Sequence, residues 1–116
     1  MGIFKRRKLR EATLASSSRV RVDKKTKHLT QRLQAGEIAV IDHADIDRIA
    51  AETLVAAAPS AVLNAAKSTT GRYPNMGPSI IVDAGITLID DLGSRIMNLK
   101  EGTKVTIEGN SVFQNG

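Results

Sequence analysis

Two short apolar runs without any polar residue constrain the fold of this chain more than any other feature. They are Ile38–Ile41 and Ala61–Leu63. A strand with one solvated face alternates apolar and polar side chains, so an uninterrupted run indicates a strand covered on both faces. Segments with helical patterning separate such runs. This alternation predicts an α/β domain whose sheet is mainly parallel and has helices on its faces.

The other elements are predicted from periodicity and turn residues. A stripe of residues three and four apart predicts a helix that Asp45 or Asp42 can cap. The stripe consists of Ile46, Ile49, Ala50, Thr53, Leu54 and Ala57. In chain order we expect a short strand at 19–23, a basic helix at 24–33, a strand at 38–41, a helix at 46–57, a strand at 61–63, a helix at 78–84, a strand at 86–89, a short helix at 92–99 and a β-hairpin at 103–114.

Composition limits the class of protein. A chain of 116 residues suits one domain, and with no Trp, one Tyr and two Phe its core must be aliphatic. The absence of cysteine excludes disulfides and thiolate chemistry. No run of about 18 apolar residues is present, so we expect no membrane-spanning helix. A basic start without a following apolar segment also predicts no signal peptide.

The positive charge is concentrated at one end of the chain. Residues 1–33 hold eleven Lys and Arg against two acids, whereas residues 34–116 carry a net charge of −4. We therefore expect a basic flexible arm at 1–19, followed by a single α/β domain at 20–116. The arm's cluster is Lys5, Arg6, Arg7, Lys8 and Arg10. It suits an anionic membrane surface or an acidic partner, or it is a solvated tail; nucleic acid is disfavoured because aromatic residues for stacking are scarce.

The loop that follows the second apolar run is the predicted binding site. Its residues combine an amide, two cations, three hydroxyls and a glycine: Asn64, Lys67, Ser68, Thr69, Thr70, Gly71 and Arg72. Pro78 then favours the start of a helix. A strand, a polar loop and a helix start together form an arrangement that binds anions through free backbone N–H groups. The alternative is a solvated loop whose glycines only make turns.

Acidic residues follow the other predicted strands. Parallel strands bring their carboxyl ends to one edge, where ligands of open α/β sheets bind. We therefore expect Asn64 and the 67–72 loop to lie near Asp42, His43, Asp90 and Asp91. The candidates for a metal site are the acids Asp42, Asp45, Asp90 and Asp91, and helix capping is the alternative. The sequence does not identify a cofactor.

Several catalytic motifs are absent. No G-x-G-x-x-G follows a predicted strand, and Pro78-Ser79 stands where a phosphate-binding loop requires Lys and Ser or Thr. Ser68, His43 and Asp90 can be combined on paper into a hydrolytic triad, but no G-x-S-x-G elbow supports it.

Four blocks of sequence carry a family resemblance. They are RVDKKTK with HLTQRL at 21–33, GEIAVIDHADIDRIAAETLV at 36–55, NAAKSTTGRYPNMGP at 64–78 and AGITLIDDLG at 84–93. In this order they closely resemble the amino-terminal region of the SteA-like cytokinetic ring proteins of bacteria. The resemblance covers roughly residues 20–110.

The resemblance implies a function. In that family the region precedes a domain similar to the thiamin pyrophosphokinase catalytic domain, and then a membrane segment, so this chain is expected to be a fragment. It implies a binding module in septation, with a SteB-like membrane protein as partner and a cytoplasmic location at the membrane or septum. The alternative implied is part of a nucleotide or diphosphate transfer enzyme whose catalytic domain lies elsewhere.

The carboxy-terminal part has a second resemblance. The layout of AGITLIDDLG followed by a β-hairpin is similar to the swivelling phosphohistidine domain of PEP-utilising enzymes, which implies a small β/β/α domain. That domain carries its phosphorylated His at the helix start before the Gly-Ile strand. The matching place here lies near Met76, where no His is present. The architecture is therefore expected to carry over, but the phosphoryl transfer is not.

Overall fold

The computed structural model describes residues 3–4, 16–71 and 75–115. Its strands are β1 (Ile3–Phe4), β2 (Ser16–Val22), β3 (Ile38–Ile41), β4 (Ala61–Asn64), β5 (Thr87–Ile89), β6 (Lys104–Glu108) and β7 (Ser111–Gln114). Its helices are α1 (Thr26–Arg32), α2 (Arg48–Ala57) and α3 (Gly77–Asp83), with a short 3-10 helix, η1 (Ser94–Asn98). The predicted α/β class is confirmed, and the three central strand ranges agree with the prediction within a residue.

The strands form one curled sheet of mixed direction. Their order is β1-β7-β6-β2-β3-β4-β5. The pairs among β2, β3, β4 and β5 are parallel, and the pairs that join β1, β7, β6 and β2 are antiparallel. Only half of the sheet is therefore parallel, which corrects the expectation of a mainly parallel sheet. The predicted hairpin, β6 and β7, is confirmed, but it makes the antiparallel half of the sheet.

Strand β2 joins the two halves. Ser16 to Arg19 pair with β6, and Val20 to Val22 pair with β3. This strand begins inside the segment predicted as an arm, so Ser16 to Arg19 belong to the sheet. The polar run of three serines has no apolar alternation to mark a strand; its pairing depends on β6, where Ser17 Oγ lies 2.7 Å from Thr106 Oγ1.

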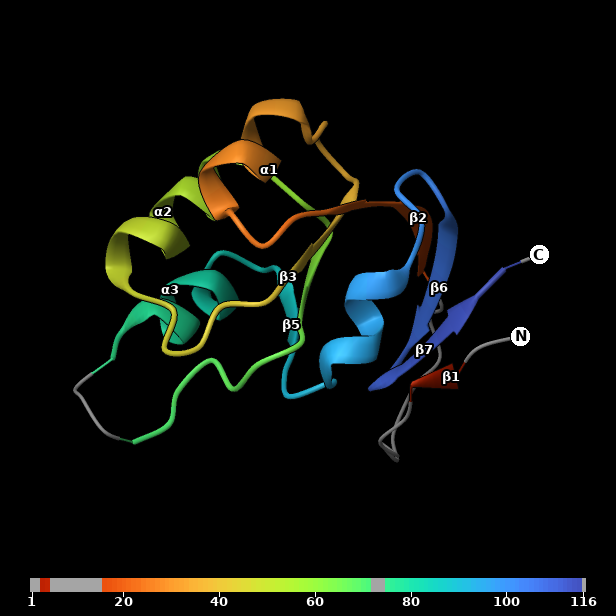
Figure 1. Ribbon diagram of the computed structural model, residues 1–116. Helices are drawn as coiled ribbons and strands as arrows, with labels where there is room; N and C mark the ends of the chain where they lie inside the picture. The colour runs from red at the N-terminus through yellow and green to blue at the C-terminus, as the bar shows by residue number, and fades with distance from the viewer. Residues whose placement is uncertain (1–2, 5–15, 72–74, 116) are drawn as a thin grey trace.

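All three α-helices cover the same face of the parallel strands (Figure 1). The strand order β2-β3-β4-β5 moves in one direction, and right-handed crossovers then fall on one face. The opposite face is covered by η1 and the β6–β7 hairpin. We expected helices on both faces of the sheet, but the three α-helices all lie on one face. The same one-way order means that the parallel strands have no topological switch point at which neighbouring loops diverge.

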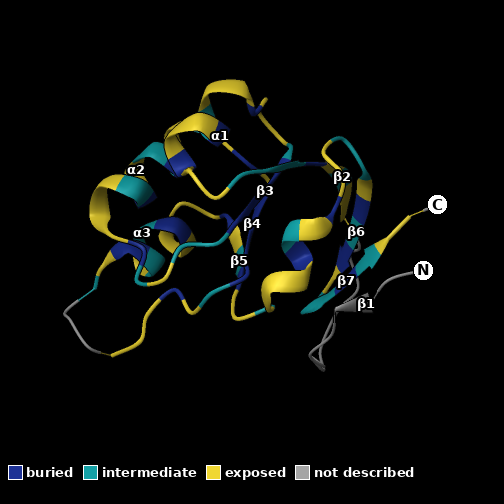
Figure 2. Cartoon of the chain, in the orientation of Figure 1, coloured by how far each residue is buried: buried dark blue, intermediate teal, exposed yellow. Residues whose placement is uncertain are grey.

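Each face of the parallel strands has its own apolar cluster. Beneath the α-helices lie Leu29, Leu33, Ala39, Ile41, Ile46, Ala51, Leu54, Val62, Ile81 and Ile86. Beneath the hairpin and η1 lie Val20, Ile38, Val40, Ala61, Leu63, Ala65, Ile89, Ile96, Leu99, Val105, Ile107 and Val112. Every residue of β3 and β4 is buried, so these strands are dark throughout in Figure 2. The prediction of strands covered on both faces is confirmed.

Helix α2 differs from its prediction in its start, its cap and one residue of its buried face. Asp47 caps it, because its side chain accepts a hydrogen bond of 2.8 Å from Ala50 N. Ile46 of the predicted stripe lies before the helix, and it and Leu54 are fully buried. Ala50, Thr53 and Ala57 of the stripe are half-buried. Ile49 is the exception at 76% exposed.

A network of ion pairs holds α1 against β2 and the turn before β6. Its members are Arg21, Asp23, Arg32, Glu37 and Glu101. Arg32 Nε lies 2.6 Å from Glu101 Oε2, and Arg21 Nε lies 2.9 Å from Glu37 Oε1. Arg32 therefore joins segments 69 residues apart in the sequence.

This network predicts a pH dependence of stability. Hydrogen bonds from Arg32, and one from the backbone of Val22, lower the pKa of Glu101 from 4.5 to about 2. Because the folded pKa is depressed, the stabilisation is complete above about pH 4.5 and is lost as the pH falls towards 2. We expect Glu101→Gln to lower stability by about 1 kcal/mol at pH 7, allowing for solvent screening, and the difference from the parent to close by pH 2.

Urea titrations of both proteins at several pH values test this. Lys104→Gln, at a lysine outside the network, serves as the control. If the free energies of unfolding of Glu101→Gln and the parent differ by the same amount at pH 7 and at pH 2, the proposed role of the carboxylate is contradicted.

Candidate functional site

The loops that follow β3, β4 and β5 meet at the carboxyl edge of the parallel strands, as predicted. Asp45 N donates to Lys67 O at 3.0 Å, which joins the first two loops. Asp91 N donates to Ala66 O at 3.2 Å, which joins the third. Backbone hydrogen bonds therefore gather the predicted site residues into one region of the surface.

Asn64, the last residue of β4, holds these loops together. Its side chain is 0% exposed. Its Oδ1 accepts from His43 N at 3.0 Å and from Ala66 N at 3.1 Å. Its Nδ2 donates to His43 O and to Ser68 Oγ, both at 2.9 Å. All the donors and acceptors of the amide are used, so Asn64 fixes the loops and has no group left for a ligand.

Ser68 is also an internal residue. It is 2% exposed, and both its N–H and its hydroxyl donate to Asp90 Oδ1. No histidine lies between them, because the Ser68 hydroxyl donates directly to Asp90, and His43 Nδ1 is 3.1 Å from Ala44 O. The bonded pair of Ser68 and Asp90 lacks the histidine base that a hydrolytic triad needs.

Hydrogen bonds also fix the part of the loop that follows Ser68. Asp45 has a left-handed backbone, with φ of 52°, and its carboxylate accepts from Thr70 N at 2.7 Å and from Thr70 Oγ1 at 3.0 Å. Asn75 donates to Ser68 O at 2.7 Å and accepts from Gly77 N at 3.1 Å. The first N–H of α3 is therefore occupied, and Pro78 has none, so neither of the first two residues of this short helix supplies a free donor of the kind predicted for an anion site.

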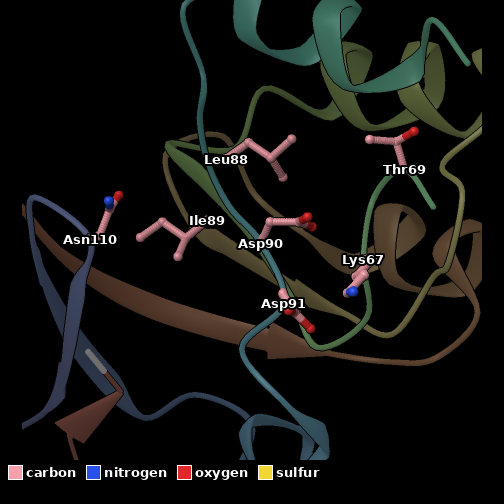
Figure 3. A pocket seen from close by; sticks show the side chains of 7 residues that line it. All are labelled: Lys67, Thr69, Leu88, Ile89, Asp90, Asp91 and Asn110. Atoms are coloured by element: carbon pink, nitrogen blue, oxygen red, sulfur yellow. The ribbon is translucent and has the colours of Figure 1, made fainter. Parts of the chain in front are cut away.

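Two predicted loop residues remain open to solvent and line a pocket. Lys67 and Thr69 are exposed, and the pocket beside them has a volume of about 410 Å³ (Figure 3). Its other lining residues are Leu88, Ile89, Asp90, Asp91 and Asn110. The pocket thus lies between the loop after β4, the end of β5 and the tip of the β6–β7 hairpin.

The pocket carries more negative than positive charge. Lys67 forms no ion pair with any residue in 16–71 or 75–115. Asp91, whose φ is 53°, makes no side-chain hydrogen bond in the described part of the chain. Asp90 uses Oδ1 for Ser68. One ammonium and two carboxylates therefore face the pocket.

The remaining candidates are placed as follows. Gly71 is exposed with φ of 81°, a left-handed conformation that suits glycine in a turn. Arg72 and the arm residues Lys5, Arg6, Arg7, Lys8 and Arg10 lie outside the described residues. Asp42 is half-buried. Across the described ranges no three His, Cys, Asp or Glu residues come together as a metal site, so the four candidate acids do not form one cluster.

The sequence did not indicate the pocket's second wall. Asn110 lies in the hairpin turn, 20 residues after Asp90, and nothing in its local sequence points to β5. Leu88 and Ile89 were predicted as strand residues only. Their contact with the pocket follows from the folding of the hairpin over the sheet through β2 and β6.

Comparison with known proteins adds no assignment. Neither a model of any protein family nor any curated protein matches this chain. No helix among the described residues is long and apolar enough to cross a membrane.

Proposed function

We propose that this domain is a binding module that holds a protein partner at the pocket beside Lys67. The observation that carries the proposal is the contrast within one loop. Asn64 and Ser68 are buried, and their hydrogen bonds fix the backbone of the loops. Lys67, Thr69 and Asp91, on the same loops, are exposed to solvent. A surface whose support is already formed loses little conformational entropy on binding.

A protein partner suits the pocket better than a phosphate-bearing ligand. Lys67 can bind an anion, and Thr69 can donate to one, but Asp90 and Asp91 face the same space. Like-charge repulsion from two carboxylates opposes a phosphate. A protein surface with a basic and a polar group can satisfy both signs of charge together, with Leu88 and Ile89 beneath it.

The family resemblance gives the biological setting of the proposal. The domain is then the amino-terminal module of a SteA-like septation protein, and its partner is a SteB-like membrane protein of the division machinery. A fold of the swivelling β/β/α type is in keeping with the three layers of α-helices, parallel strands and hairpin. Localisation at the membrane or septum is part of the same proposal, with the basic arm as a second contact to an anionic surface.

The rival proposal is part of a nucleotide or diphosphate transfer enzyme. In this case Asp90 and Asp91 would hold magnesium. Calorimetry with nucleoside diphosphates, with and without magnesium, separates the two. A metal-dependent heat of binding that Asp91→Asn abolishes would favour the enzyme over the partner module.

A variant of Lys67 tests partner binding directly. We expect Lys67→Ala to weaken capture of a purified SteB-like protein about tenfold, as loss of a central charged contact does at interfaces. The melting temperature should change by no more than about 2 °C, since substitutions of exposed residues usually cost under roughly 0.5 kcal/mol. Surface plasmon resonance and thermal denaturation measure the two effects.

Lys27→Ala is the matched control, because Lys27 is an exposed lysine on α1 away from the pocket. Equal binding by the parent, Lys67→Ala and Lys27→Ala would remove the pocket from the proposal. A large loss of stability in Lys67→Ala alone would show that this lysine supports the fold.

A further inference from the structure

Strand β5 ends the sheet on its parallel side. It pairs with β4 from Ala61↔Thr87 to Leu63↔Ile89. No strand in the described part of the chain pairs with its other edge. Alternate residues of an edge strand direct their N–H and C=O groups away from the sheet, where an extended segment can bond to them.

The residues of this edge are also the floor of the pocket. Leu88, Ile89, Asp90 and Asp91 are consecutive, and all four line it (Figure 3). The strand is Thr87-Leu88-Ile89, with neither the lysine nor the proline that commonly blocks an open edge. A segment lying along β5 would therefore place one of its side chains at the pocket.

The charge of the pocket indicates which kind of segment can bind along β5. The pocket has two carboxylates, at the end of β5, against the one ammonium of Lys67, and the carboxylate of Asp91 has no side-chain partner in the described part of the chain. An added segment with Lys or Arg at the pocket would pair with Asp91. A second copy of this domain fits less well, because pairing two β5 edges would bring two such acidic ends to one interface.

We propose that the partner adds an extended, basic segment to β5 as a further strand, with one Lys or Arg side chain in the pocket beside Asp91. The inference rests on the proposed function and names the form of the partner. Three residues give few backbone hydrogen bonds, so both the strand pairing and the basic side chain are needed for binding.

Selection from a phage library of random decapeptides, on the immobilised domain, supplies the probe. The proposal expects selected peptides with Lys or Arg flanked two residues away by β-branched residues. Two analogues of the best peptide then carry N-methyl groups, one on odd and one on even amides. Only alternate amides face the neighbouring strand, so one analogue should lose at least tenfold in affinity and the other should bind almost as before.

The protein side of the test uses charge variants with a matched control. Asp91→Asn should weaken the peptide about fivefold or more, and asparagine accepts the left-handed backbone at this position. Asp83→Asn makes the same charge change at an exposed site outside the pocket and should have no effect. Hydrogen exchange should show new protection at residues 87–89 when the peptide is bound.

The contrary outcomes are distinct. Equal binding of both methylated analogues, no selected peptide, or a peptide-free dimer that protects residues 87–89 would each overturn strand addition. If Lys67→Ala weakens capture of the SteB-like protein in these cases, the partner module stands and only the form of its partner is wrong. If Lys67→Ala has no effect on capture of the SteB-like protein while the peptide test succeeds, the pocket accepts an added strand, but the contact of this partner with Lys67 is wrong.

Discussion

Asn64→Ala should be among the most destabilising single substitutions in this domain. The change removes four hydrogen bonds from a fully buried amide and leaves two backbone N–H groups and a carbonyl without partners. Each buried group left unpaired costs about 1–3 kcal/mol, and partial relaxation reduces the sum. We expect a loss of about 3 kcal/mol, which lowers the melting temperature of a domain of this size by roughly 15 °C.

Thermal and urea denaturation of Asn64→Ala measure this loss. Thr69→Ala is the control, because Thr69 is exposed in the same loop, and it should change stability by less than about 0.5 kcal/mol. Hydrogen exchange adds a local readout: the amides of Asp45 and Asp91, which bond across the loops, should lose protection in Asn64→Ala. A variant as stable as Thr69→Ala would mean that the loops do not depend on this amide.

Gly77→Ala should be comparably damaging for a steric reason. A Cβ atom at this position would lie 1.9 Å from Ile46 O and 2.7 Å from Ile46 C. Both are backbone atoms of the segment that leads into α2, so no side-chain rotation relieves the clash. Overpacking of a closed site costs about 1–3 kcal/mol, and a contact with backbone belongs at the upper end of that range.

Urea denaturation of Gly77→Ala should therefore show a loss of about 3 kcal/mol. Ser79→Ala, at an exposed position in the same helix, is the control and should stay within about 0.5 kcal/mol of the parent. Stability of Gly77→Ala equal to that of Ser79→Ala would contradict the close approach of α3 to Ile46.

The sequence predicted where the candidate site lies in the fold but not what its residues do there. Parallel strands end at one edge, and this rule alone predicts that Asn64, Asp90 and the 67–72 loop lie together; Ser68 of this loop bonds to both Asn64 and Asp90. The side chains of these residues also form hydrogen bonds with one another, so Asn64 and Ser68 are buried and hold the loops in place. Sequence spacing does not distinguish an amide that binds a ligand from one that binds the neighbouring loop, because both need the same donors and acceptors.

Local sequence determined the elements with strong patterns. Uninterrupted apolar runs gave β3 and β4, and alternation around Gly109-Asn110 gave the β6–β7 hairpin. These signals are contained within a few residues and depend only on burial or turn chemistry. The serines of β2 lacked such a signal, whereas its second half lies in the strand predicted at 19–23. Asp47 has the same capping chemistry as Asp42 and Asp45, so residue type alone did not select it.

Tertiary structure decided how the elements meet. The bend that lets β2 pair with both β6 and β3 folds the hairpin over the sheet, closes the second apolar cluster and brings Asn110 to the end of β5. The pairing of β2 with β6 links residues up to 91 apart, Ser16 and Ile107. The choice of such pairings depends on the free energy of the assembled core, which no short stretch of sequence contains.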